Sequence, residues 1–101
     1  MFENDFVPYV VQAVPGENYT VYAYMNDGSV RLVDVKPLIA KGNLFKKLKD
    51  KDFFDSVTVM NNSVAWDLSG VRDPYNCIDL DPCMVGECPV VADPLNMEAT
   101  A

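Results

Sequence analysis

Two short turn sequences most constrain what this chain of 101 residues can fold into. Asn26-Asp27-Gly28-Ser29 lies between two runs of β-favouring residues, 19–25 and 30–35. Asn61-Asn62 lies between two more such runs, and a further run, 7–14, precedes the first hairpin. Asn, Asp and Gly tolerate the positive φ angles of tight hairpin turns. The sequence therefore predicts a three-stranded antiparallel meander followed by a second hairpin.

The first hairpin also predicts which side chains share a face. If Asp27 and Gly28 are the two central residues of a two-residue turn, the cross-strand pairs are Met25 with Val30, Ala23 with Leu32, Tyr24 with Arg31, and Tyr22 with Val33. The first two pairs and Val21 would form the core face. Tyr22, Tyr24 and Arg31 would form an amphipathic face on which a guanidinium can stack over a ring and a partner can bind. The alternative for this face is that a helix covers it.

In the second hairpin, Asn61 and Asn62 can occupy both positive-φ positions of a two-residue turn. This places Val59 opposite Val64, and Val57 opposite Trp66. Trp66 on an inward-facing strand is expected in the core, although an indole at the end of a sheet can also anchor a protein interface.

Helical signals lie between and after the hairpins. Pro37 can open a short helix and Gly42 can close it. Leu44, Phe45 and Leu48 recur at helical spacing, and the capping residues Asp50 and Asp81 each precede a further helical turn, of which the first carries Phe53 and Phe54 inward. The predicted fold class is α+β, with a small antiparallel sheet packed against two or three short helices. Residues 1–88 are expected to form one domain and residues 89–101 an irregular tail, either mobile or docked on a neighbour.

Charge is unevenly distributed in this acidic chain, which carries fifteen Asp and Glu residues against eight Lys and Arg. Five lysines lie within 41–51, whereas 67–101 contains seven acids against Arg72 alone. We interpret the lysine run as a solvated helix face, with a contact patch for anions as the alternative. A polyanion such as DNA is repelled at long range, so direct binding of nucleic acid through this domain is not expected. The acidic segment can steer a basic protein partner, or can simply confer solubility.

The residues that usually carry catalysis are missing. There is no histidine, and the five glycines are scattered singly, so nucleophile–histidine pairs and phosphate-binding loops are absent from the sequence. Asp79 and Asp81 would share one side of a strand, where solvent-facing charges are the favoured interpretation and a weak cation site the alternative. We predict that the protein is not an enzyme and needs no cofactor.

The three cysteines, Cys77, Cys83 and Cys88, form an odd set with five and four residues between them. A structural zinc site prefers four ligands and closer spacing, so reduced thiols are favoured over a zinc site or a Cys83–Cys88 disulfide. The first six residues lack the features of a secretory signal, and no apolar run approaches the roughly 20 residues that span a bilayer. We therefore expect a cytoplasmic protein that does not bind membranes.

An ordered set of short motifs resembles the family called domain of unknown function 2442. The motifs are Asn26-Asp27-Gly28, then 33–39 (VDVKPLI), 45–50 (FKKLKD), Phe53-Phe54, Val64-Ala65-Trp66 and 78–82 (IDLDP). The resemblance covers roughly 7–84 and implies a small bacterial α+β protein without established enzymatic activity. Members resemble adaptor modules, and some are suspected antitoxins. This chain departs from the pattern in the loop 70–76, in its cysteines and in the tail after Glu87.

These observations lead to one prediction of function. The chain is expected to be a non-catalytic protein-interaction module, the antitoxin-like component of a toxin–antitoxin pair, which binds and masks a basic toxin. The predicted contact residues are Tyr22, Tyr24, Arg31, Trp66, Asp79 and Asp81. The alternatives are a small-ligand or metal-binding module, in which Cys77, Cys83 and Cys88 would hold the metal, and a homodimeric scaffold joined by sheet edges.

Overall fold

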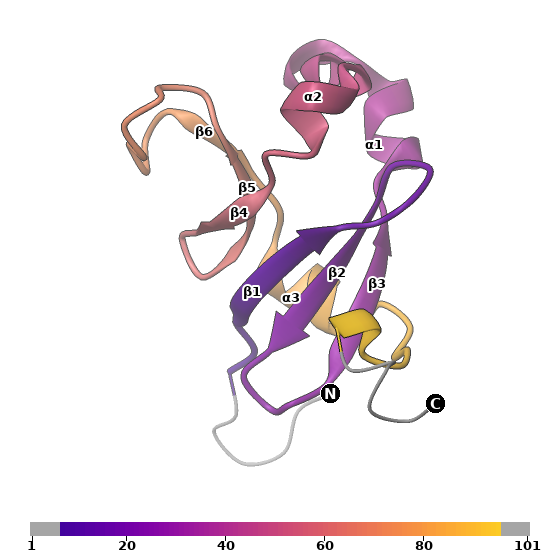
Figure 1. Ribbon diagram of the computed structural model, residues 1–101. Coiled ribbons are helices and arrows are strands. Elements are labelled where there is room, and N and C mark those ends of the chain that lie inside the picture. Colours follow the sequence, from indigo (N-terminus) through magenta and orange to yellow (C-terminus); the bar gives the residue numbers. More distant parts are fainter. Residues whose placement is uncertain (1–6, 96–101) are drawn as a thin grey trace.

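The computed structural model describes residues 7–95, and the expectations that concern residues 1–6 and 96–101 lie outside this range. Two three-stranded antiparallel sheets and three short α-helices confirm the predicted α+β class (Figure 1). In chain order the elements are β1 (Val10–Pro15), β2 (Thr20–Met25), β3 (Val30–Asp34), α1 (Lys36–Lys41), the 3₁₀ helix η1 (Asn43–Lys49), α2 (Lys51–Phe54), β4 (Thr58–Met60), β5 (Ser63–Asp67), β6 (Cys77–Asp79) and α3 (Pro82–Gly86).

The first sheet has the order β1-β2-β3, as the meander predicted, but its β2–β3 register was predicted wrongly. Tyr24 lies opposite Val30, Tyr22 opposite Leu32 and Ala23 opposite Arg31. The cause is the turn: the Met25 N–H donates to the Ser29 carbonyl at 2.9 Å, which makes 26–28 a three-residue loop. Gly28 has φ +89°, the left-handed conformation that closes such a loop. The extra loop residue moves Arg31 to the opposite face from Tyr24.

The alternation within β2 was predicted correctly. Val21, Ala23 and Met25 are buried, whereas Tyr22 and Tyr24 are half-buried on the other face of the sheet. We call the face with Tyr22 and Tyr24 the outer face of this first sheet.

The second sheet has the order β4-β5-β6. Asn61 and Asn62 have φ angles of 55° and 63°, and Val59 lies opposite Val64, so the two-residue turn is confirmed. Four consecutive residues of the central strand β5, from Ser63 to Trp66, are buried. β5 is the central strand of its own sheet and also contacts β1 of the first sheet and α3, so neither of its faces is open to solvent. This explains the loss of alternation here.

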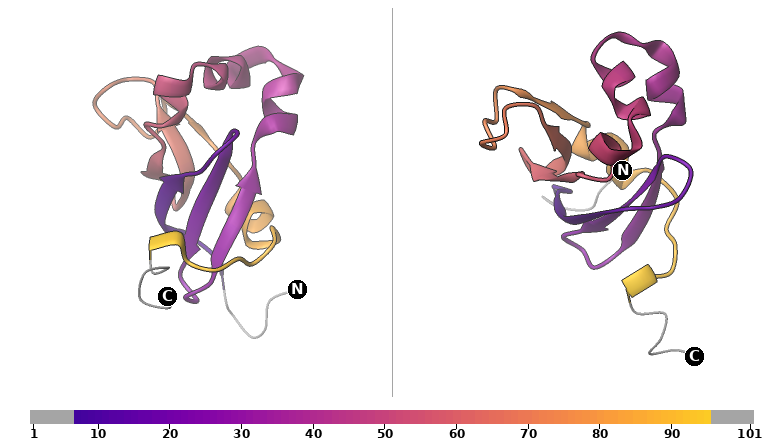
Figure 2. Two further views of the ribbon diagram at one scale, coloured as in Figure 1. Left: turned by 45° about the vertical axis from the view of Figure 1, so that its right-hand side comes forward. Right: turned by 45° about the horizontal axis from the view of Figure 1, so that its top comes forward.

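The short helices begin and end at the residues that the sequence indicated. Pro37 lies in the first turn of α1 and Gly42, with φ +81°, follows its last residue. The carboxylate of Asp50 accepts a hydrogen bond from the Asp52 N–H at 3.1 Å, and that of Asp81 accepts one from the Cys83 N–H at 2.9 Å. These contacts satisfy backbone donors at the starts of α2 and α3. Figure 2 shows α1, η1 and α2 together at one end of the molecule.

One hydrophobic core joins the two sheets and the helices. Trp66 is 0% exposed, and its indole N–H donates to the Phe54 carbonyl at 2.9 Å. The ring of Phe54 lies between those of Trp66 and Tyr19, at centroid distances of 5.6 and 5.2 Å. The Val10 N–H donates to the Asn62 carbonyl at 2.9 Å, which links the start of β1 to the second hairpin.

Part of the predicted tail lies beside β3 of the same chain. We call residues 88–93 the edge segment. The Leu32 N–H donates to the Pro89 carbonyl and the Val91 N–H to the Val30 carbonyl, both at 2.9 Å, and Arg31 forms an antiparallel bridge with Val90. The edge segment therefore continues the first sheet beyond β3.

Candidate protein-interaction surface

The two tyrosines of the outer face differ in their accessibility. The Tyr24 hydroxyl donates to the Asp93 carboxylate of the edge segment at 2.5 Å. Burial, followed by this hydrogen bond and the charge of Asp93, raises the pKa of Tyr24 to about 12. Tyr22 instead lines an open cleft of about 660 Å³ together with Leu32, the β1–β2 turn, Lys51 of α2 and Asp55 immediately after it. Tyr24 is thus engaged within the chain, whereas Tyr22 is accessible.

Arg31 does not join these tyrosines, because the register places it on the other face. Its Nη1 donates to the Cys88 carbonyl at 2.8 Å and its Nε to the Ser29 hydroxyl at 3.3 Å. The guanidinium therefore holds Cys88, two residues after α3, against β3. The predicted stacking of Arg31 on Tyr24 is wrong.

Trp66 occupies the core position that the sequence favoured. Its side chain is fully buried, so in this structure it lies out of reach of a surface partner. The role suggested for Trp66 as an interface anchor is corrected accordingly.

Asp79 and Asp81 are both exposed but do different things. Asp79 accepts a hydrogen bond from the Asn61 side-chain amide at 3.2 Å, whereas Asp81 caps α3 beyond the end of β6. Asp81 thus begins a helix and does not continue the strand of Asp79, so the expectation that both carboxylates share one side of a strand is not met.

The cysteines do not form a metal centre in the described part of the chain. All three are free, and no group of three or more Cys, Asp or Glu side chains within residues 7–95 could hold a metal ion. Burial, reinforced by the charges of Asp79, Asp67 and Asp73, raises the pKa of Cys77. Burial also raises the pKa of Cys88, so both thiols stay protonated at neutral pH.

The most exposed aromatic side chain of the described residues was not among the predicted contacts. It belongs to the connection between β5 and β6, residues 68–76, which we call the Tyr75 loop. Tyr75 is 97% exposed and Val71 is 80% exposed. The sequence identified this segment as a loop, and the signal that was overlooked is an aromatic residue between Pro74 and Asn76, where no strand or helix can bury it.

Asp67 holds the start of the Tyr75 loop. One carboxylate oxygen accepts from the Ser69 N–H at 2.9 Å and from its hydroxyl at 2.7 Å, and the other accepts from the Arg72 N–H at 2.8 Å. The hydrogen bond from the Ser69 hydroxyl is the main reason why the pKa of Asp67 is lowered. The ionised carboxylate thus organises the backbone as far as Arg72.

Further contacts fix the loop to the second sheet. The Arg72 guanidinium donates to the Val59 carbonyl of β4 at 2.8 Å, and the Asn61 amide donates to the Pro74 carbonyl at 3.1 Å. The Asp73 carboxylate accepts from the Tyr75 N–H at 2.9 Å. The Tyr75 loop is therefore held at both ends and its middle, while the side chains of Val71 and Tyr75 are exposed to solvent.

The surroundings of the loop are acidic. Asp67, Asp73 and Asp79 all lie close enough to act on the Cys77 thiol at the end of the loop, and Arg72 is the only basic residue between positions 52 and 101. The ion pairs found among residues 7–95 are Lys36–Asp34 and Lys51–Asp55, and neither involves the acids of this region. These carboxylates thus give the loop a negative field that internal pairing does not cancel.

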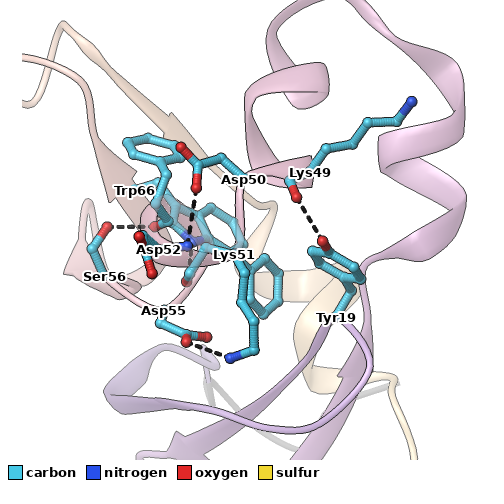
Figure 3. A network of polar contacts seen from close by, with 10 residues as sticks. Tyr19, Lys49, Asp50, Lys51, Asp52, Asp55, Ser56 and Trp66 are labelled. Carbon is cyan, nitrogen blue, oxygen red and sulfur yellow. Dashed lines mark hydrogen bonds and ion pairs between the residues drawn. The ribbon is translucent and has the colours of Figure 1, made fainter.

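The polar network around α2 serves the fold (Figure 3). The Tyr19 hydroxyl donates to the Lys49 carbonyl at 2.5 Å, and Lys51 pairs with Asp55 at 2.6 Å. Together with the Asp50 cap, these contacts satisfy the ends of η1 and α2.

In comparisons with known proteins, no protein-family model, no curated protein and no solved structure matches this chain. Among residues 7–95, none of the helices has the length and apolar character that crossing a membrane requires.

Proposed function

We propose that this protein is a non-catalytic interaction module that binds a basic protein partner through the Tyr75 loop. The observation that carries the proposal is Tyr75, which is 97% exposed on a loop that its own hydrogen bonds hold in place. Tyrosine is enriched among the residues that dominate binding energy in interfaces. A loop that is ordered before binding loses little conformational entropy when a partner docks.

The charge of the loop indicates the chemistry of the partner. The carboxylates of Asp67, Asp73 and Asp79 would raise the association rate of a lysine- or arginine-rich surface and disfavour an acidic one. Tyr75 and Val71 would then pack against apolar groups at the centre of that surface. Of the contacts predicted from sequence, Asp79 belongs to this surface, whereas Asp81 caps α3 and Tyr22, Tyr24 and Arg31 lie on the first sheet.

The biological setting that we propose is a toxin–antitoxin pair in the cytoplasm of a bacterium, in which this chain masks a basic toxin. Two features support it: the motif resemblance to the domain of unknown function 2442 family, and the acidic surface around an exposed aromatic. Free cysteines are compatible with a reducing compartment.

The experiment is co-expression of the full chain with the product of the neighbouring gene, followed by isothermal titration calorimetry. We expect a complex whose affinity falls as NaCl is raised from 50 to 500 mM, roughly tenfold or more for several charge contacts. Tyr75→Ala should weaken binding by about tenfold or more, because it removes a central aromatic anchor.

Tyr9→Ala is the matched control, because Tyr9 is also an exposed tyrosine (43%) but lies immediately before β1, outside the Tyr75 loop. It should bind as the wild type does. The absence of a complex at low salt, or equal affinity of wild type and Tyr75→Ala, would refute the proposal.

A further inference from the structure

The outer edge of β3 is only partly paired by the edge segment. In an antiparallel ladder, both backbone groups of every second residue point to the same neighbour. Ser29 and Val35 hydrogen-bond to the Met25 N–H and the Tyr19 carbonyl, so among the residues between them the backbone groups of Arg31 and Val33 face β2. Those of Val30, Leu32 and Asp34 point away from β2, toward the edge segment. The edge segment supplies two backbone hydrogen bonds to this edge, one at Val30 and one at Leu32.

Pro89 leaves this pairing incomplete. It faces Leu32 and accepts the Leu32 N–H, but it has no N–H to donate in return to the Leu32 carbonyl. Asp34, the next edge-facing residue, lies beyond the place where the chain leaves β3 for Cys88 and α3. The half of the edge that runs from the Leu32 carbonyl to Asp34 therefore remains open to a strand that can donate.

The edge segment is also loosely attached. Val90 is 61% exposed, and Pro89 and Ala92 are exposed as well, so the segment buries little apolar surface. Besides the two backbone bonds, it is held by the Arg31–Cys88 and Tyr24–Asp93 contacts. Its displacement would remove hydrogen bonds at the surface and the packing of the half-buried Cys88 against the core, but none of the fully buried core residues.

A cleft on the outer face lies where side chains of an added strand would point. A residue opposite Leu32 or Asp34 has its side chain on the same face as Leu32 and Thr20. Thr20, Tyr22 and Leu32 all line the open cleft of about 660 Å³. An apolar side chain in the position of Pro89 would therefore meet Leu32 and the ring of Tyr22.

We infer that the edge of β3 is a strand-acceptor site: a proline-free extended segment of a protein partner replaces the edge segment, pairs with 30–34 and inserts an apolar side chain beside Leu32 and Tyr22. This is strand addition to an exposed sheet edge, in which backbone hydrogen bonds give affinity and side-chain pockets give specificity. The site lies on the first sheet and does not depend on the Tyr75 loop.

The test uses the full chain and a synthetic nine-residue peptide with the sequence of residues 87–95 and the replacements Pro89→Val, Asp93→Ala and Pro94→Ala, so that the peptide has no proline and no carboxylate for the Tyr24 hydroxyl. The binding of the peptide is followed by NMR. We expect shifts and slowed amide exchange at residues 30–34. Tyr24→Phe, which releases Asp93 of the edge segment, should bind the peptide several-fold more tightly than the wild type, because the competing segment loses one hydrogen bond that the peptide does not make.

Pro89→Ala in the full chain should change the affinity for the peptide in the opposite direction. It gives the edge segment the N–H that can reach the Leu32 carbonyl, so it should weaken peptide binding several-fold. Tyr75→Ala should bind the peptide as the wild type does, which keeps this test separate from the proposed function. Equal binding by the wild type, Tyr24→Phe and Pro89→Ala, shifts confined to other residues, or no binding at millimolar peptide would each overturn the inference.

Discussion

The two sheets differ in how accessible their surface aromatic side chains are. On the first sheet, the chain returns from a distant part of the sequence to pair with β3, and Asp93 takes the Tyr24 hydroxyl. On the second sheet, side chains hold a loop that leaves Tyr75 in solvent. Backbone pairing closes a surface, whereas a loop tied by its own side chains can keep an aromatic exposed and ordered. We therefore call the part of the first sheet around Tyr24 and the edge segment the covered region, and the Tyr75 loop the open region.

The largest expected effect tests what joins the two regions. Trp66→Ala should destabilise the protein by about 3–5 kcal/mol, because it empties a large space in the common core. Trp66→Phe should cost less, on the order of 1–3 kcal/mol, since it retains an aromatic ring but leaves the Phe54 carbonyl without its donor.

Urea unfolding followed by circular dichroism measures both variants, because Trp66 is the only tryptophan and its fluorescence is lost in each. If Trp66→Ala were as stable as the wild type, the shared core described between the sheets would be wrong.

The second prediction concerns a substitution in the open region alone. Asp67→Ala removes the acceptor of three hydrogen bonds and should release the Tyr75 loop and lower the free energy of unfolding. Hydrogen exchange should become faster at Ser69 and Arg72 and remain unchanged at Val30 and Leu32. Equally fast exchange in both regions would show that the loop and the first sheet are not independent.

The dependence of this difference on pH provides a second test. Because the pKa of Asp67 is lowered in the folded protein, its contribution to stability is complete above the ordinary value of 3.8 and disappears as the pH falls through the lowered one. The exchange difference between wild type and Asp67→Ala should therefore shrink below pH 4 and be present at pH 6.

The third prediction concerns the turns that set the two registers. Gly28→Ala should destabilise the protein by about 1 kcal/mol, because position 28 has φ +89° and the cost is conformational, with open space around the added methyl group. Asn62→Gly is the matched change in the second hairpin, at φ 63°, and should be neutral or slightly stabilising. A neutral Gly28→Ala would contradict the three-residue loop.

These turns also show how far the sequence can predict the fold. Asn61-Asn62 allowed one interpretation, and the second hairpin was predicted correctly with its register. Asn26-Asp27-Gly28 suits both a two-residue and a three-residue loop, and the Asp27 carboxylate, which binds the N–H and hydroxyl of Ser29, favours the longer one. A shift of one residue is invisible in the alternation of β2 but decides where Arg31 points.

The candidate surfaces were harder to predict, because they depend on contacts distant in sequence. Helix caps at Asp50 and Asp81 are local, and both were found. The pairing of Val90 with Arg31 joins residues that are far apart in the chain, and no local pattern announces it. Tyr75 was recognisable as a loop residue, yet its nearly complete exposure follows from the anchoring of Arg72 on β4, which sequence reasoning cannot place.

The smallest expected effect sharpens the description of the covered region. Tyr24→Phe removes the hydrogen bond to Asp93 and should cost about 1 kcal/mol or less, since the edge segment keeps its backbone bonds.

The folded-state pKa of Tyr24 is raised from 10.0 to about 12. A raised pKa means that the neutral hydroxyl is favoured in the folded state, so this stabilisation is complete below pH 10 and is lost as the pH rises toward 12. The difference in unfolding free energy between wild type and Tyr24→Phe should thus disappear over this range, whereas Tyr22→Phe, on the same face but without the Asp93 contact, should show no such change. Faster amide exchange at Val91 in Tyr24→Phe at neutral pH would locate the effect at the edge segment. Unchanged exchange there would mean that the backbone bonds alone hold the edge segment. The missing N–H of Pro89, and not the Tyr24 hydrogen bond, would then determine how easily the segment is displaced from β3.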